Sequence, residues 1–149
     1  MDNVDFSLIR QRADRQGNVL NKLRDNFFQE IAQEHLEMYG DSKSKLYDIS
    51  YDDGVFKLDL SPIGVNVHIE EKFIFLNRTV VKQISFTHRD DFTKEKTNII
   101  NFFIGTDGQY SLKENGEPIG LISSEYSYDI FFPNLFNALK QQNLLTSDY

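Results

Sequence analysis

The chain has 149 residues, which fits one domain spanning 1–149 with a core large enough to fold without disulfides or metals. It is acidic, with 23 Asp and Glu against 16 Lys and Arg and a net charge of −7. Non-specific binding to a nucleic-acid backbone depends on Lys and Arg, so we expect no direct nucleic-acid partner. The lack of cysteine excludes disulfides, thiolate metal ligands and cysteine nucleophiles.

No targeting segment or membrane span is predicted. The N-terminus reads "MDNVDFSLIRQR", which is acidic before it is apolar and contains no hydrophobic run of signal-peptide length. No segment approaches the roughly 18 apolar residues needed to cross a bilayer. We therefore expect a cytoplasmic protein with no membrane partner.

Residues 5–39 have the periodicity of an amphipathic helix, because apolar residues recur at steps of three and four. These residues are Phe6, Ile9, Ala13, Leu20, Leu23, Phe27 and Ile31. Gly17 and Asn18 either separate two shorter helices or lie within one long helix, where a glycine costs about 1 kcal/mol. Both alternatives stay open. A long helix that projects from the core would favour a homodimer.

The period then changes to two over residues 46–122, which predicts an antiparallel β-meander of about seven strands. Strand patterns occur at 46–51, 55–60, 65–70, 72–77, 79–86, 98–104, 109–112 and 118–122. Asp53-Gly54 and Asn115-Gly116 are strong hairpin signals. Because nearly every connection is short, neighbours in sequence are expected to pair.

The segments 72–77 and 98–104 are apolar on both faces, which predicts central strands that are covered on both sides. The N-terminal helical segment is expected to cover one face of the sheet. A C-terminal helix at 128–145 is expected to cover the other face, although a homodimer contact could replace either cover. The predicted class is α+β, with helices at both ends and a sheet between them.

No catalytic, metal or cofactor site is predicted. His35, His68 and His88 fall on three different predicted elements, and none lies at metal-ligand spacing to another. The "HRD" at 88–90 lacks the other kinase motifs and is interpreted as a charged hairpin loop. Common nucleotide and nucleophile motifs are absent, so we expect a non-enzyme and no cofactor. An enzyme built from scattered groups on a sheet face, such as Asp59, His68 and Glu70, stays as an alternative.

An acidic edge lies at the end of the predicted helical segment and consists of Glu30, Glu34, Glu37 and Asp41. Like charges at this spacing repel, and the C-terminal end of a helix already carries partial negative charge. Either the glutamates are solvated and paired with lysines such as Lys43 or Lys45, or they dock a basic protein.

The leading hypothesis is a non-catalytic, acidic protein-binding module that uses this acidic edge. An immunity protein or inhibitor that neutralises a basic toxin or nuclease is one example. A second hypothesis is a small-molecule-binding or enzymatic protein with a pocket lined by some of its thirteen Phe and seven Tyr residues. A third is a structural homodimer subunit that associates through the N-terminal helix.

Overall fold

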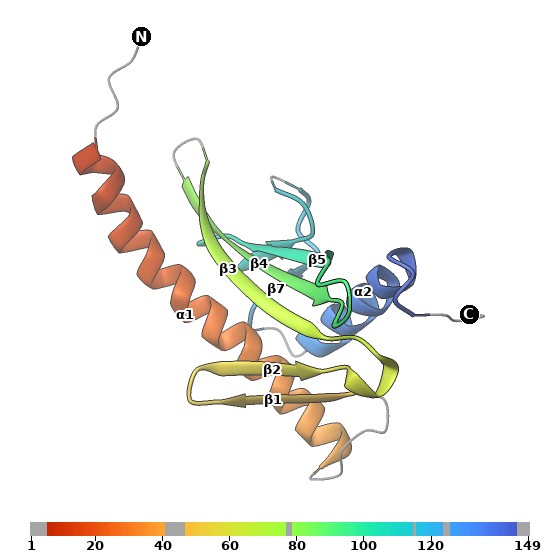
Figure 1. Cartoon of the computed structure of the whole chain (residues 1–149). Helices are drawn as coiled ribbons and strands as arrows, with labels where there is room; N and C mark the ends of the chain where they lie inside the picture. Colours follow the sequence, from red (N-terminus) through yellow and green to blue (C-terminus); the bar gives the residue numbers. More distant parts are fainter. Residues whose placement is uncertain (1–5, 41–46, 77–78, 115, 124–125, 146–149) are drawn as a thin grey trace.

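The computed structural model describes residues 6–40, 47–76, 79–114, 116–123 and 126–145. Its elements, in chain order, are α1 (Phe6–Tyr39), β1 (Asp48–Asp52), β2 (Val55–Asp59), β3 (Val67–Leu76), β4 (Thr79–Arg89), β5 (Lys96–Ile104), β6 (Gln109–Ser111), β7 (Gly120–Leu121) and α2 (Ser127–Gln141). A short 3-10 helix, Ser61–Ile63, lies between β2 and β3. The arrangement confirms the predicted α+β class, with a helix at each end of an antiparallel β region (Figure 1).

The N-terminal segment is one long helix, so of the two alternatives only the single helix is correct. Gly17 lies inside it and is buried against β3, where an added Cβ would come within 3.6 Å of the Phe73 ring. The apolar stripe continues past this glycine through the fully buried Leu20, Phe27 and Ile31. No helix among the described residues is both long and apolar enough to cross a membrane.

The seven strands form two sheets, a β1-β2 hairpin and a five-stranded sheet in the order β3-β4-β5-β6-β7. All neighbouring strands pair antiparallel, as expected from the short connections. The predicted hairpin turn at Asp53-Gly54 is present, with positive φ angles of 50° and 77°. β2 and β3 belong to different sheets, and the segment between them forms one isolated bridge, Leu60 to Val65, which lies outside both strands.

The prediction that segment 72–77 is a central strand is wrong. Its described residues belong to β3, which also includes most of the separately predicted strand at 65–70. β3 is an edge strand paired only with β4, and Phe73 and Phe75 are 40% and 55% exposed. Segment 98–104 does occupy a central position, as part of β5 between β4 and β6. The apolar periodicity could not show which of the two segments is the central strand, because the order of strands depends on how they pair.

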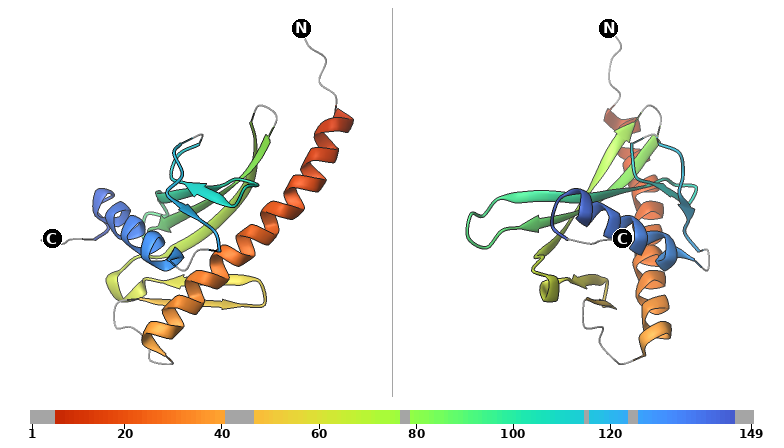
Figure 2. Two further views of the ribbon diagram at one scale, coloured as in Figure 1. Left: turned by 180° about the vertical axis from the view of Figure 1, so that it is seen from behind. Right: turned by 90° about the vertical axis from the view of Figure 1, so that its right-hand side faces the viewer.

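Both helices cover the same face of the larger sheet, so the expectation of opposite faces is also wrong. The ring centroids of Phe27 in α1 and Phe131 in α2 lie 5.8 and 5.4 Å from that of Phe102 in β5. The two helical rings also contact each other at 6.2 Å. The cross-strand pair Ser85 and Asn101 lies on the opposite face, which can stay solvated. Figure 2 shows the two helices and the larger sheet from two further directions.

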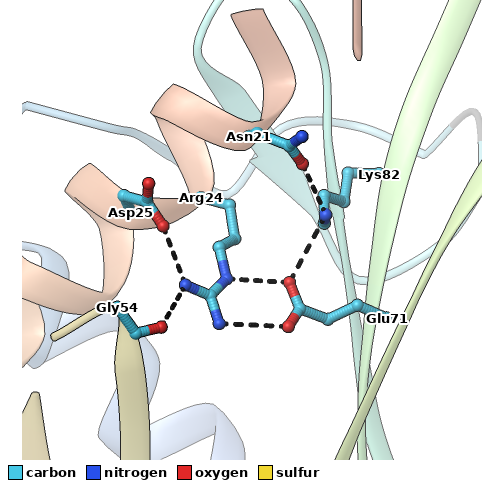
Figure 3. A network of polar contacts seen from close by, with 6 residues as sticks. All are labelled: Asn21, Arg24, Asp25, Gly54, Glu71 and Lys82. Atoms are coloured by element: carbon cyan, nitrogen blue, oxygen red, sulfur yellow. Dashed lines mark hydrogen bonds and ion pairs between the residues drawn. The ribbon is translucent and has the colours of Figure 1, made fainter. Parts of the chain in front are cut away.

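A polar network on α1 holds the hairpin and the edge strand in place (Figure 3). The Arg24 guanidinium donates two hydrogen bonds to Glu71 of β3, at 2.8 and 3.1 Å, and one to the carbonyl of Gly54 at 2.8 Å. Lys82 Nζ donates to Asn21 Oδ1 at 2.8 Å and lies 3.5 Å from Glu71. The bidentate geometry suits arginine, which links α1 to both sheets at one point.

Candidate functional site: a polar groove along α1

Two glutamates of the predicted acidic edge bind the start of α2. Glu30 Oε2 accepts hydrogen bonds from the backbone N–H of Ser123 and the hydroxyl of Ser127, both at 3.0 Å. Glu34 Oε2 accepts a hydrogen bond from the backbone N–H of Tyr128. These contacts are neither of the two alternatives considered from the sequence, which were pairing with lysines and docking of a basic protein. The carboxylates instead bind another part of their own chain.

The start of α2 needs these acceptors. Its N-cap residue, Tyr126, makes no side-chain capping hydrogen bond. A helix N-terminus has unpaired N–H groups and partial positive charge, so a carboxylate is a favourable ligand there. Glu34 supplies it from a different helix by accepting the Tyr128 N–H, and Glu30 binds the Ser127 hydroxyl beside it. The repulsion that they cause within α1 is thereby offset by their contacts with α2.

The surroundings of the Glu34 carboxyl shift its pKa. Burial raises its pKa above the ordinary value, the hydrogen bond from Tyr128 opposes this, and the charges of Asp129 and Glu30 raise the pKa further. A cation placed beside Glu34 would relieve this repulsion and favour the ionised carboxylate.

Glu37 differs from the other two glutamates. Its side chain is exposed, and its Oε1 accepts a hydrogen bond from Gln33 Nε2 at 3.3 Å, within the same helix face. Asp41, Lys43 and Lys45 lie outside the described residues. Of the predicted edge, the structure therefore describes the three glutamates, of which two bind α2 and one faces solvent.

An open groove of about 650 Å³ contains all three glutamates. Its lining consists of Asn26, Gln29, Glu30, Gln33, Glu34, Glu37 and Ser123. The lining holds carboxylates, amides and one hydroxyl but no lysine or arginine, so it is negatively charged and rich in hydrogen-bonding groups. The amides were not predicted from the sequence, although their helical spacing places them beside the glutamates. Ser123 could not be predicted, because a long-range contact brings it to α1.

His35 belongs to a buried aromatic cluster at the end of the groove helix. It is 4% exposed, and its ring lies 4.9 Å from Tyr39, 5.4 Å from Tyr47 and 5.9 Å from Tyr128. Burial lowers the pKa of its imidazole, while Asp48, with Oδ1 at 3.7 Å from Nε2, opposes the shift. Tyr47 and Tyr128 share a hydrogen bond between their hydroxyls. The cluster joins α1, the start of β1 and α2, which is a structural role.

The remaining histidine motifs are also structural. His88 Nδ1 accepts a hydrogen bond from the backbone N–H of Asn66 at 2.9 Å. Asp90 accepts hydrogen bonds from the backbone N–H groups of Phe92 and Thr93, at 2.8 and 2.9 Å. The "HRD" segment thus ends β4 and opens a hairpin loop, as interpreted from the sequence. Among the residues that the structure describes, no three His, Asp or Glu side chains gather closely enough to hold a metal ion.

Comparison with known proteins finds no relative of this chain. No protein-family model, no curated protein and no solved structure matches the chain.

Proposed function

We propose that this protein is a non-catalytic binding module whose acidic groove takes a basic segment of another protein. The observation that carries the proposal is that Glu30, Glu34 and Glu37 line a single groove without a basic residue among its lining. An inhibitor that covers the basic surface of a toxin or nuclease is the kind of protein that fits these properties.

The spacing of the glutamates suits a segment with several cations. From Glu30 to Glu37 the helix rises about 10 Å, at 1.5 Å per residue. Lysine or arginine side chains on successive turns of a partner helix, or on alternate residues of an extended segment, span a similar distance. Complementary charge raises the association rate and selects among partners more than it adds affinity.

The groove is partly organised before any partner arrives. Glu30 and Glu34 are already held by α2, so binding loses less side-chain entropy than it would at free carboxylates. The amides of Asn26, Gln29 and Gln33 can both donate and accept hydrogen bonds with the backbone of a bound segment.

The proposal is tested with a fluorescent peptide of about ten residues that contains four arginines, and with a charge-reversed peptide as the negative control. Anisotropy should show binding of the arginine peptide that weakens about tenfold between low and high salt, because screening acts on exposed charges. The Glu37→Gln variant should bind several-fold more weakly, since Glu37 is exposed and its described partner is Gln33. Glu117→Gln, which alters an exposed carboxylate outside the groove, is the matched control. The proposal would be overturned if the Glu37→Gln and Glu117→Gln variants bound the arginine peptide equally well. It would also be overturned if binding did not depend on salt.

A further inference from the structure

A continuous surface runs along the outer side of α1, and we call it the outer face. Its residues recur at steps of three and four and are exposed, apart from the half-buried Arg12: Leu8, Arg12, Arg15, Val19, Lys22, Asn26, Gln29, Gln33 and Glu37. The spacing is that of a helix face that packs against another helix. Leu8 and Val19 are 44% and 42% exposed, which places apolar surface within this face.

The charge of the outer face changes sign along the helix. Arg12, Arg15 and Lys22 make its N-terminal half basic. Glu37, together with the adjoining Glu30 of the groove, makes its C-terminal half acidic. A parallel helix partner with the same sequence would meet like charges, whereas an antiparallel one would meet opposite charges.

We propose that the outer face binds a second copy of this chain, with the two α1 helices antiparallel across a two-fold axis. The proposal rests on the groove of the proposed function and names the basic segment that occupies it as the N-terminal half of the other copy's α1. Such a contact is closed and uses the same surface on both copies, as most homodimers do.

The register follows from the chain itself. If the axis lies between Lys22 and Leu23, residues equally distant from it meet, so Arg15 faces the other copy's Glu30. Arg12 then faces Gln33, one helical turn from Glu37. Each groove receives two arginines, and each contact occurs twice by symmetry. The charge pattern of one helix therefore supplies both halves of the interface.

The area of the contact indicates how stable the dimer should be. The 34 residues of α1 extend about 50 Å. With a strip about 10 Å wide on each copy, the contact removes on the order of 1,000 Å² in total from water, the lower limit for a stable interface. The dimer should consequently be weak, dependent on concentration and sensitive to salt.

Sedimentation velocity with a charge-swapped pair tests the proposal. One variant, Arg12→Glu, places a negative charge opposite Gln33 and Glu37, and the other, Gln33→Lys with Glu37→Lys, has a more basic groove that complements it; Arg15 and Glu30 are unchanged in both. Neither variant touches the glutamates that bind α2. Each variant alone should dimerise at least tenfold more weakly than the natural chain, and an equimolar mixture should regain dimers. Circular dichroism confirms that both variants are folded.

Two results would overturn the proposal. One is a natural chain that stays monomeric at about 100 μM in low salt, well above the micromolar affinities expected for such a contact. The other is a mixture that associates no better than the separate variants. If the natural chain is monomeric but the arginine peptide binds the groove, the dimer fails and the proposed function stands. If the swap restores dimers but the arginine peptide does not bind, the dimer stands and the proposed function fails.

Discussion

Replacing Glu30 tests the interpretation that α1 stabilises the start of α2. The Glu30→Ala variant removes one carboxylate oxygen that accepts two hydrogen bonds, from Ser123 and Ser127. Ser127 is fully buried, so its hydroxyl would lose its acceptor in a place that water does not readily reach. Ser123 is exposed, and water can replace the contact there.

The expected loss of stability follows from these two environments. A buried donor left unsatisfied costs about 1–3 kcal/mol, and loss of a negative charge at a helix N-terminus costs about 0.3–1 kcal/mol. We therefore expect Glu30→Ala to lower the free energy of unfolding by about 2–3 kcal/mol. Glu30→Gln keeps an acceptor but removes the charge, so its loss should be about 1 kcal/mol. For a chain of this size the alanine variant should melt about 5–10 °C lower.

The assay is urea unfolding followed by far-UV circular dichroism, at one protein concentration and in high salt to limit association. Glu37→Ala is the matched control. It removes an exposed carboxylate about two helical turns further along α1, and it should change stability by less than about 0.5 kcal/mol. If Glu30→Ala and Glu37→Ala are equally stable, the stabilising role of Glu30 at the start of α2 is refuted.

Two further variants probe α1 at other points. Gly17→Ala should stabilise the protein by about 0.5–1 kcal/mol, because alanine favours the helix and its Cβ would meet the Phe73 ring at an ordinary 3.6 Å; a lower melting temperature would contradict this. The pKa of His35 is lowered in the folded state, so its contribution to stability is fully present above the ordinary pKa of 6.5 and is lost as the pH falls through the lowered value. His35→Phe should accordingly lose less stability than the natural chain between pH 7 and 5 in urea titrations, and identical pH profiles would rule this account out.

The two proposals concern the same surface and make a joint prediction. A basic partner in the groove and the N-terminal half of a second α1 cannot occupy the same carboxylates at once. Dimerisation would thus lower the apparent affinity for a basic partner at high protein concentration. The arginine peptide should in turn shift the sedimentation profile toward monomer.

The position of the acidic edge on α1 was predictable, but its role was not. Helical periodicity placed Glu30, Glu34 and Glu37 on one side of a helix, and the rules for helix charges identified the arrangement as unfavourable in isolation. The compensating partner is the start of α2, about ninety residues further along the chain. No local signal indicates which distant backbone N–H groups lack acceptors, so the capping contacts appear only in the folded structure.

The sequence by itself determined the elements that depend on local chemistry. The period of the apolar residues predicted the helices and the strands, and Asp53-Gly54 predicted the first hairpin because that turn requires positive φ angles. Tertiary structure decided what depends on pairing and packing. It made β3 an edge strand and placed both helices on one sheet face through the contacts of Phe27 and Phe131 with Phe102. It also brought Ser123 to the groove, because which surfaces meet is a property of the whole chain.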